Sequence, residues 1–163
     1  MIMEYAKTSK WVKTPTRANP SDAGLDVYAN MAEDIRWVIK PGGNIMVPTG
    51  LRFGIPHGYM LQVCNRGSMG AKRSLVVGAH IIDSGYDGEV FIDLHNIGNE
   101  EQTIQGGDKI AQLVLVPVVH FRLIESGDGT LYKRSQITIS NRDDGALGSS
   151  DPHPLNGINV GGF

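Results

Sequence analysis

The sequence has very little cysteine and no long hydrophobic segment. Cys64 is the only cysteine among 163 residues, so an internal disulfide is excluded and a reducing compartment is favoured. The longest uninterrupted apolar run, Leu113–Val119, is far shorter than the roughly 20 residues of a membrane-spanning helix. Met1–Asn19 holds no apolar core of a secretory signal. We therefore expect an intracellular, cytoplasmic protein that contacts no membrane.

An excess of positive charge is also lacking. The chain has 15 Lys and Arg against 17 Asp and Glu, which gives a formal net charge of -2. A protein that binds the nucleic-acid backbone usually carries a basic excess, so we expect no nucleic-acid partner. Apolar residues make up 40% of the chain, which excludes a mostly disordered protein. The length fits a single domain.

Long helical patterns are absent as well, whereas glycine is abundant at 21 residues. Short apolar segments recur between Gly and Pro residues, and they predict strands at Leu51–Ile55, Tyr59–Cys64, Glu89–His95 and Ile110–Val119. The last of these is nearly continuous Leu and Val, so we expect it to be buried on both sides, with a bend or edge at Pro117. Only Met69–Leu75 could form a short helix. The pattern predicts an all-β fold, namely a sandwich, jelly roll or barrel.

Five short stretches combine glycine with charged or hydroxyl residues: Ala23–Asp26, Asn65–Gly70, Gly78–Gly88, Gly107–Gln112 and Arg142–Ser150. Each one alone is ordinary turn chemistry. Together they supply arginines, hydroxyls and accessible backbone amides, which are the groups that hold a polyphosphate. The carboxylates of Asp26 and Asp83 could hold Mg²⁺ or activate a water. None of the stretches ends in Gly-Lys-Ser/Thr, so a P-loop nucleotidase is excluded.

In their order and spacing, these five stretches resemble the five motifs of the trimeric dUTPase family. The resemblance runs from about Asp22 to Ser150, and Ile82–Glu89 and Gly107–Leu113 carry it most strongly. It implies a β jelly-roll domain over residues 1–141 and an arm over residues 142–163 that closes over the active site, with its last residues disordered. It also implies a homotrimer with shared active sites. The implied reaction is Mg²⁺-dependent hydrolysis of dUTP to dUMP and pyrophosphate.

The resemblance implies a role for each matching residue. Asp83 matches the catalytic aspartate, which polarises a water aimed at the α-phosphorus. Tyr86 matches the tyrosine that packs against the deoxyribose, and Asp26 matches an aspartate that reaches Mg²⁺ through water. Main-chain atoms of the segment Gly78, Ala79 and His80 match those that read uracil. The positions that match phosphate-binding and arm residues are Arg66, Gly67, Ser68, Gln112, Arg142, Leu147, Gly148, Ser149 and Ser150.

Several positions depart from the family pattern. Gly67 stands where a serine is usual, and losing that hydroxyl could cost about 10²–10³ in rate unless Ser68 replaces it. Leu147 stands where an aromatic ring covers uracil. Asp143 and Asp144 place negative charge in the arm, where small residues are usual.

Two other functions remain open at this point. His80, where glycine is common, and Asp93, near the position of a catalytic glutamate, also resemble the related dCTP deaminases, including bifunctional deaminase–dUTPases. We favour a surface role for Asp93, because Glu89, Phe91, Asp93 and His95 share one mostly polar strand face. A second alternative is a nucleotide-sensing interaction protein, for which the departures would suit slow turnover. Turnover with Mg²⁺ distinguishes a sensor from an enzyme.

Overall fold

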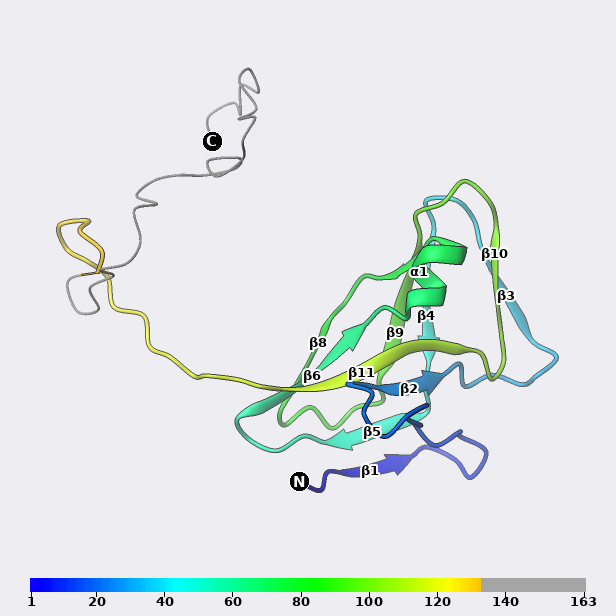
Figure 1. The fold of residues 1–163 in the computed structure, drawn as a ribbon, viewed down its shortest axis with the longest axis horizontal. Coiled ribbons are helices and arrows are strands. Elements are labelled where there is room, and N and C mark those ends of the chain that lie inside the picture. The colour runs from blue at the N-terminus through cyan, green and yellow to red at the C-terminus, as the bar shows by residue number, and fades with distance from the viewer. Residues whose placement is uncertain (133–163) are drawn as a thin grey trace, which may run out of the picture. The chain divides into compact units, whose positions relative to one another are not determined.

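The computed structural model describes residues 1–132, which form eleven strands and one short helix (Figure 1). The chain divides into two units, Met1–Phe121 and Arg122–Phe163. All of these strands lie in the first unit. The second unit is described only as far as Tyr132, and it contains a turn in which the Gly129 N–H donates to the Ser126 carbonyl. The arm predicted from residue 142 lies outside the described residues. No helix within residues 1–132 is long and apolar enough to cross a membrane.

Four antiparallel sheets make up the first unit. One sheet of four strands has the order β2-β11-β6-β8, and one of three strands has the order β4-β9-β7. Two further pairs are β1 with β5 and β3 with β10. The bounds are β1 Glu4–Lys7, β2 Leu25–Tyr28, β3 Arg36–Ile39, β4 Asn44–Pro48, β5 Leu51–Gly54, β6 Tyr59–Cys64, β7 Leu75–Val77, β8 Ile81–Asp83, β9 Phe91–Asn96, β10 Gln102–Gln105 and β11 Lys109–Pro117.

The all-β prediction is confirmed, and the jelly-roll fold fits this arrangement. All four predicted strands are present, and β11 ends at Pro117 because proline has no N–H to continue the ladder. The prediction that this strand, β11, is buried on both sides is only partly confirmed. Ile110 and Ala111 are fully buried, whereas Leu115 and Val116 are half-buried. The reason is that β2 pairs only with the first part of β11. The second part of β11 is therefore flanked by β6 alone.

The core is formed by alternating side chains of the strands. Leu51 of β5, Leu75 of β7, Ile92 of β9, Ile104 of β10 and Ile110 of β11 are all completely buried. Burying one such side chain contributes about 1.5–3 kcal/mol to folding. These side chains make the sheets a rigid support for the polar residues at the strand ends.

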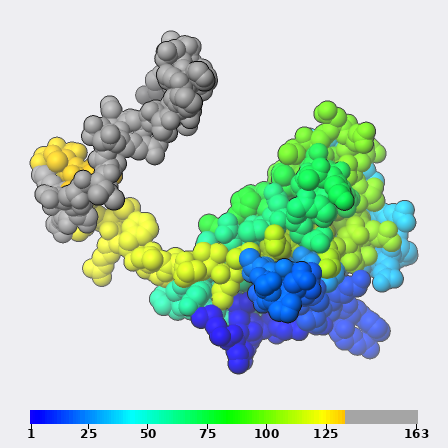
Figure 2. Space-filling model, viewed as in Figure 1, coloured from blue at the N-terminus to red at the C-terminus, as the bar shows by residue number. Residues whose placement is uncertain are grey.

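Helix α1, Gly67–Arg73, follows β6 and begins two residues before the predicted position. It ends early because Ser74 adopts the left-handed conformation, with φ 51°, and its N–H donates to the Gly70 carbonyl. Met69 is buried and anchors the helix on the sheets. On the face shown in Figure 2, α1 (green) and the loop before β2 (blue) stand on either side of β11 (yellow-green).

Candidate active site

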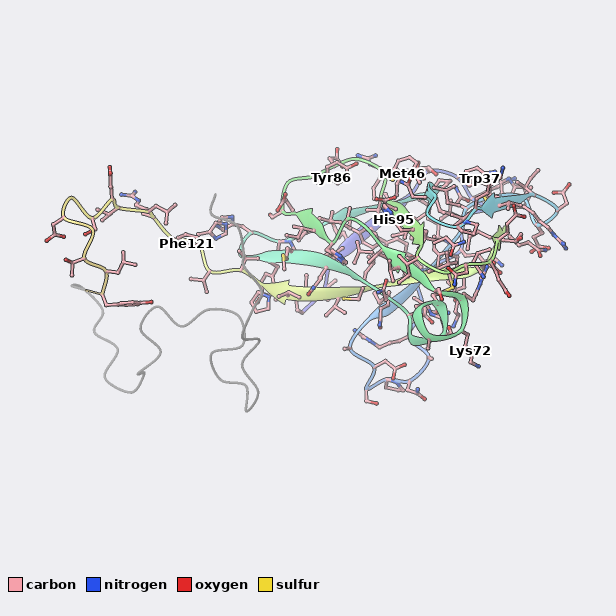
Figure 3. The ribbon with its side chains drawn as sticks, turned by 90° about the horizontal axis from the view of Figure 1, so that it is seen from above. Trp37, Met46, Lys72, Tyr86, His95 and Phe121 are labelled. Atoms are coloured by element: carbon pink, nitrogen blue, oxygen red, sulfur yellow. The ribbon has the colours of Figure 1, made fainter. Side chains whose placement is uncertain are left out.

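The predicted site residues fall into two groups at opposite ends of β6. Gln112 of β11 is paired with Cys64 at the end of β6, next to Arg66, whereas Asp83 of β8 is paired with Met60 near its start. At about 3.3 Å per residue, Met60 and Cys64 are about 13 Å apart. Figure 3 likewise shows Lys72 of α1 on the opposite side of the sheets from Tyr86. We call the two groups the arginine group and the aspartate cleft.

The arginine group is centred on the carboxylate of Asp26 in β2. Its Oδ1 accepts a hydrogen bond from Nε of Arg66 at 2.9 Å, and its Oδ2 lies 2.8 Å from Nζ of Lys109. The hydrogen bond to Asp26 and the charge of that carboxylate raise the pKa of Lys109 above its usual value. Two cations therefore share one carboxylate, and the group keeps a net positive charge that suits a phosphate. Lys109 lies in the stretch Gly107–Gln112, but the sequence alone gave no indication of a role for it.

Arg66 is positioned by more than Asp26. Its Nη1 donates to the Lys109 carbonyl at 3.3 Å and lies 3.5 Å from Oγ of Ser68. The side chain of Arg66 is only 26% exposed, so the guanidinium is held in place rather than free in solvent. The structure thus brings together Arg66, Ser68 and Asp26. Within residues 1–132, Nη2 of Arg66 has no hydrogen-bond partner, so it can donate to a phosphate oxygen.

Gln112 belongs to the same group, but its amide has a structural partner. Nε2 of Gln112 donates to the Asn65 carbonyl at 2.9 Å, and Oδ1 of Asn65 accepts from the Val77 N–H at 2.7 Å. These bonds tie the turn before α1 to β11 and β7. Gly67, the first residue of α1, has open space around it, since a Cβ atom built there meets nothing within 4 Å. A serine side chain would therefore fit at this position.

The aspartate cleft is a cavity of about 230 Å³ on the other side of the sheets, lined by residues that include Met46, Ile82, Asp83, Tyr86, Val90 and Phe91. Asp83 is exposed at the end of β8. The Tyr86 N–H donates to the Asp83 carbonyl, and its hydroxyl donates to the Glu89 carbonyl at 2.9 Å. These bonds hold the tyrosine ring beside the aspartate. The structure therefore brings Asp83 and Tyr86 together.

The segment Gly78–His80 connects β7 to β8 next to this cleft, and all of its residues are exposed. The Val63 N–H donates to the His80 carbonyl at 2.8 Å, and Nδ1 of His80 lies 3.0 Å from the Val63 carbonyl oxygen. The backbone N–H and C=O of Ala79 have no hydrogen-bond partner within residues 1–132. An exposed donor and acceptor in adjacent positions can pair with the edge of a planar base.

Apart from the arginine group and the aspartate cleft, a polar cluster lies on the outer face of the β4-β9-β7 sheet. The carboxylate of Asp93 accepts from Nδ2 of Asn44 at 3.0 Å and lies 2.8 Å from Nε2 of His95. Burial raises the pKa of Asp93, but the hydrogen bonds from Asn44 and His95 and the charge of protonated His95 together lower it below its usual value. Both carboxylate oxygens are thus engaged. This arrangement favours the structural role over water activation.

No group of three or more His, Cys, Asp or Glu side chains within residues 1–132 could hold a metal ion by itself. Mg²⁺ commonly keeps several waters and binds through one or two carboxylates together with substrate phosphates. Both oxygens of Asp26 are engaged by Arg66 and Lys109, so its contact with Mg²⁺ through water stays a prediction. The predicted arm residues Arg142, Leu147, Gly148, Ser149 and Ser150 lie outside the described residues.

The fold and the two groups define a class, namely a jelly-roll protein with the polar groups of a nucleotide hydrolase. Within that class, the chain belongs to the dUTPase family, whose model matches residues 10–144.

Curated relatives agree with this assignment. The chain is 43% identical over 121 residues to a deoxyuridine 5'-triphosphate nucleotidohydrolase of Ectopseudomonas mendocina, covering 71% of this chain and 79% of the relative. It is 36% identical over 138 residues to the enzyme of that name from Anaplasma marginale, covering 83% and 87% of the two chains.

Solved structures show the same fold. A mutant dUTPase from phage phi11 of S. aureus, described with a structural Mg(II) ion, has a TM-score of 0.70 and 25% identity, with 78% of this chain and 97% of that chain covered. The Staphylococcus bacteriophage 80alpha dUTPase with dUpNHpp has a TM-score of 0.76 and 23% identity, covering 91% and 98%.

Proposed function

We propose that the protein is a dUTP diphosphatase, which hydrolyses dUTP to dUMP and pyrophosphate. The observation that carries this proposal is the aspartate cleft of a dUTPase-family chain, where Asp83 and Tyr86 line one cavity beside the exposed segment Gly78–His80. Cys64 is a free thiol at the end of β6, which supports an intracellular setting.

Asp83 is the proposed general base. Its carboxylate accepts a proton from a water aimed at the α-phosphorus. The water oxygen forms a bond to that phosphorus, and the bond to the oxygen bridging the α- and β-phosphates breaks. Pyrophosphate leaves with the electron pair of the broken bond. The exposed position of Asp83 on β8 gives a water access to it.

Base and sugar selection are assigned to the same cleft. The ring of Tyr86, held by its bonds to Asp83 and Glu89, packs against the deoxyribose and leaves no room for a 2′-hydroxyl. Main-chain atoms of Gly78, Ala79 and His80 read uracil, which offers an N3–H donor and an O4 acceptor. Cytosine presents the reverse pattern, so it would leave backbone groups unpaired.

The arginine group is assigned to the phosphates. Arg66, Gly67, Ser68 and Gln112 contact the triphosphate, and Asp26 reaches Mg²⁺ through water. When bound, Mg²⁺ neutralises charge on the phosphate oxygens. The positive charge that Arg66 and Lys109 leave in excess of Asp26 supports this assignment.

We further propose a homotrimer in which each active site is shared between subunits. The spacing along β6 supports it, because Cys64 beside the arginine group and Met60 beside Asp83 are about 13 Å apart on that strand. A cleft from one subunit facing the arginine group of another would bring the two groups together. The arm residues Arg142, Leu147, Gly148, Ser149 and Ser150 close the site over the γ-phosphate.

A product assay tests the proposal. The full chain is incubated with Mg²⁺ and, separately, dUTP, dCTP, dTTP or UTP, and the nucleotides are resolved by anion exchange while ammonia is measured. We expect dUMP and pyrophosphate from dUTP alone. Ammonia together with dUTP or dUMP from dCTP would instead indicate a deaminase and bring Asp93 and His80 into the active site. Binding of dUTP without turnover would indicate a nucleotide-sensing protein.

A further inference from the structure

The segment Gly78–His80, which is proposed to read the base, packs directly against the cluster of Asn44, Asp93 and His95. We call these three residues the Asp93 cluster. Strand β9 carries Asp93 and His95 on the outer face of its sheet, and the neighbouring strands place Asn44 and Val76 on either side of His95 in the register. Figure 3 shows His95 close to Met46, which lines the aspartate cleft. The cluster therefore lies beside the cleft without lining it.

Gly78 makes the contact between the segment and the cluster. Its N–H donates to the backbone carbonyl of Asp93 at 2.9 Å. A Cβ atom built on Gly78 would overlap Nε2 of His95 and Oδ2 of Asp93, the two atoms that form the ion pair. Only glycine fits at such a close approach. The backbone of the segment is thus seated on the paired carboxylate and imidazole themselves.

The other end of the segment is fixed to a different sheet. His80 exchanges two contacts with Val63 of β6, through its carbonyl and its ring nitrogen. Ala79, between these two anchors, keeps its N–H and C=O free of partners within residues 1–132. A displacement at the Gly78 anchor therefore changes the direction in which the Ala79 groups point.

The pair itself is held in one geometry. Nδ2 of Asn44 binds Oδ1 of Asp93, which leaves Oδ2 for His95 and fixes the plane of the carboxylate. The side chain of Asp93 is 18% exposed and that of His95 is 40% exposed, so solvent screens the pair only in part. A carboxylate held on both oxygens cannot rotate away from Gly78.

We infer that the Asp93–His95 pair, held by Asn44, positions Gly78–His80 and so sets how tightly the protein binds the pyrimidine base of its substrate. This inference rests on the proposed function, because it assumes that the segment reads uracil. Asp93 and His95 are positioning residues: they act through the backbone of Gly78. Loss of the pair weakens binding of the base, whereas Asp83 and the phosphate contacts keep their geometry.

The first test is steady-state kinetics of full-chain variants with dUTP and Mg²⁺. His95→Leu removes the imidazole, and we expect KM to rise about tenfold while kcat stays within about twofold. His95→Gln keeps an N–H donor that reaches Asp93, so KM should return to within about threefold of the wild type. His57→Leu is the matched control, since His57 is an exposed histidine in the turn before β6. An unchanged KM in His95→Leu, or a loss confined to kcat, would overturn the inference.

A second measurement is independent of catalysis. In ¹⁵N–¹H spectra of the full chain, the amide signals of Gly78 and Ala79 should shift in His95→Leu, and they should stay near the wild-type positions in His57→Leu. If His95→Leu does not fold, as judged by circular dichroism, Asp93→Asn takes its place in both tests. If the wild type does not hydrolyse dUTP, the proposed function fails, but the amide shifts still show whether the pair positions the segment. Unmoved amides would refute that positioning.

Discussion

Asp83 is the side chain on which the proposed chemistry depends at the scale of single residues. It is exposed at the mouth of a cavity that it shares with Tyr86, so a water molecule can reach it. Around it, the cavity is mostly apolar, with Ile82, Val90 and Phe91 among its lining residues.

We predict that Asp83→Asn retains dUTP binding but lowers kcat by about 10²–10⁴, since the amide cannot accept the proton of the water. Turnover is measured by pyrophosphate release, and binding by calorimetry with the analogue dUpNHpp. Asp87→Asn is a suitable control, because Asp87 pairs with Arg52 outside the cleft. An unchanged kcat in Asp83→Asn would remove Asp83 from its role as the base.

Gly67 is the departure from the family pattern that the structure makes easiest to test. Open space surrounds it, so a serine hydroxyl can be added without displacing a neighbour. We predict that Gly67→Ser raises kcat, by up to about 100-fold if the missing hydroxyl limits the rate. Gly67→Ala separates the hydroxyl from any effect on the backbone. A fall in kcat would indicate that Ser68 already supplies this contact.

At the scale of elements, β9 serves two purposes at once. Its inner face carries Ile92 and Leu94, which are completely buried, while its outer face carries Asp93 and His95. The period of two along a strand separates the faces, so the polar pair can be arranged without disturbing the core. Helix α1 is similarly divided, since Met69 anchors it while Arg66 and Ser68 at its start remain available to a ligand.

The lowered pKa of Asp93 predicts a pH dependence of stability. A carboxyl whose pKa is lower in the folded state stabilises the fold above its unfolded pKa of about 3.9, and this contribution is lost as the pH falls through the folded pKa. We therefore expect Asp93→Asn to flatten the loss of stability below about pH 4. Urea unfolding between pH 6 and pH 3 measures it, with Asp34→Asn as an exposed control. Equal slopes in wild type and Asp93→Asn would contradict the prediction.

At the scale of the whole molecule, the separation of the two groups is the feature that matters most. Within the described part of the chain, β6 keeps the arginine group away from the aspartate cleft, and the rigid core prevents them from approaching each other. Assembly is therefore part of the proposed mechanism, because a second subunit can bring its arginine group to Asp83.

Deletion of Asn141–Phe163 should abolish hydrolysis while leaving the trimer intact, because the resemblance assigns this segment to closing the site and the sheets lie in the first unit. Activity is measured by pyrophosphate release and the assembly by light scattering. Full activity of the shortened chain would show that the arm is dispensable. A monomeric product would show instead that the segment holds the subunits together.

The sequence by itself determined the fold class and the chemistry. Alternation of apolar residues between Gly and Pro is a local property, so the strands at Tyr59–Cys64 and Ile110–Val119 could be predicted nearly to their ends. The order of the five motifs likewise identified the dUTPase family. The predicted helix, Met69–Leu75, lay two residues beyond α1. A serine rarely indicates a left-handed helix end such as the one at Ser74, so the sequence did not reveal it.

Only the tertiary structure decided which of these residues meet. The register of β6 with β8 and β11 places Asp83 and Arg66 at opposite ends of one strand, and the approach of β9 to the segment after β7 seats Gly78 on Asp93 and His95. Lys109 joins Asp26 in the same way. Such pairings depend on contacts between segments far apart in the chain. A one-residue change of register would turn every side chain to the other face, and no local pattern specifies that choice completely.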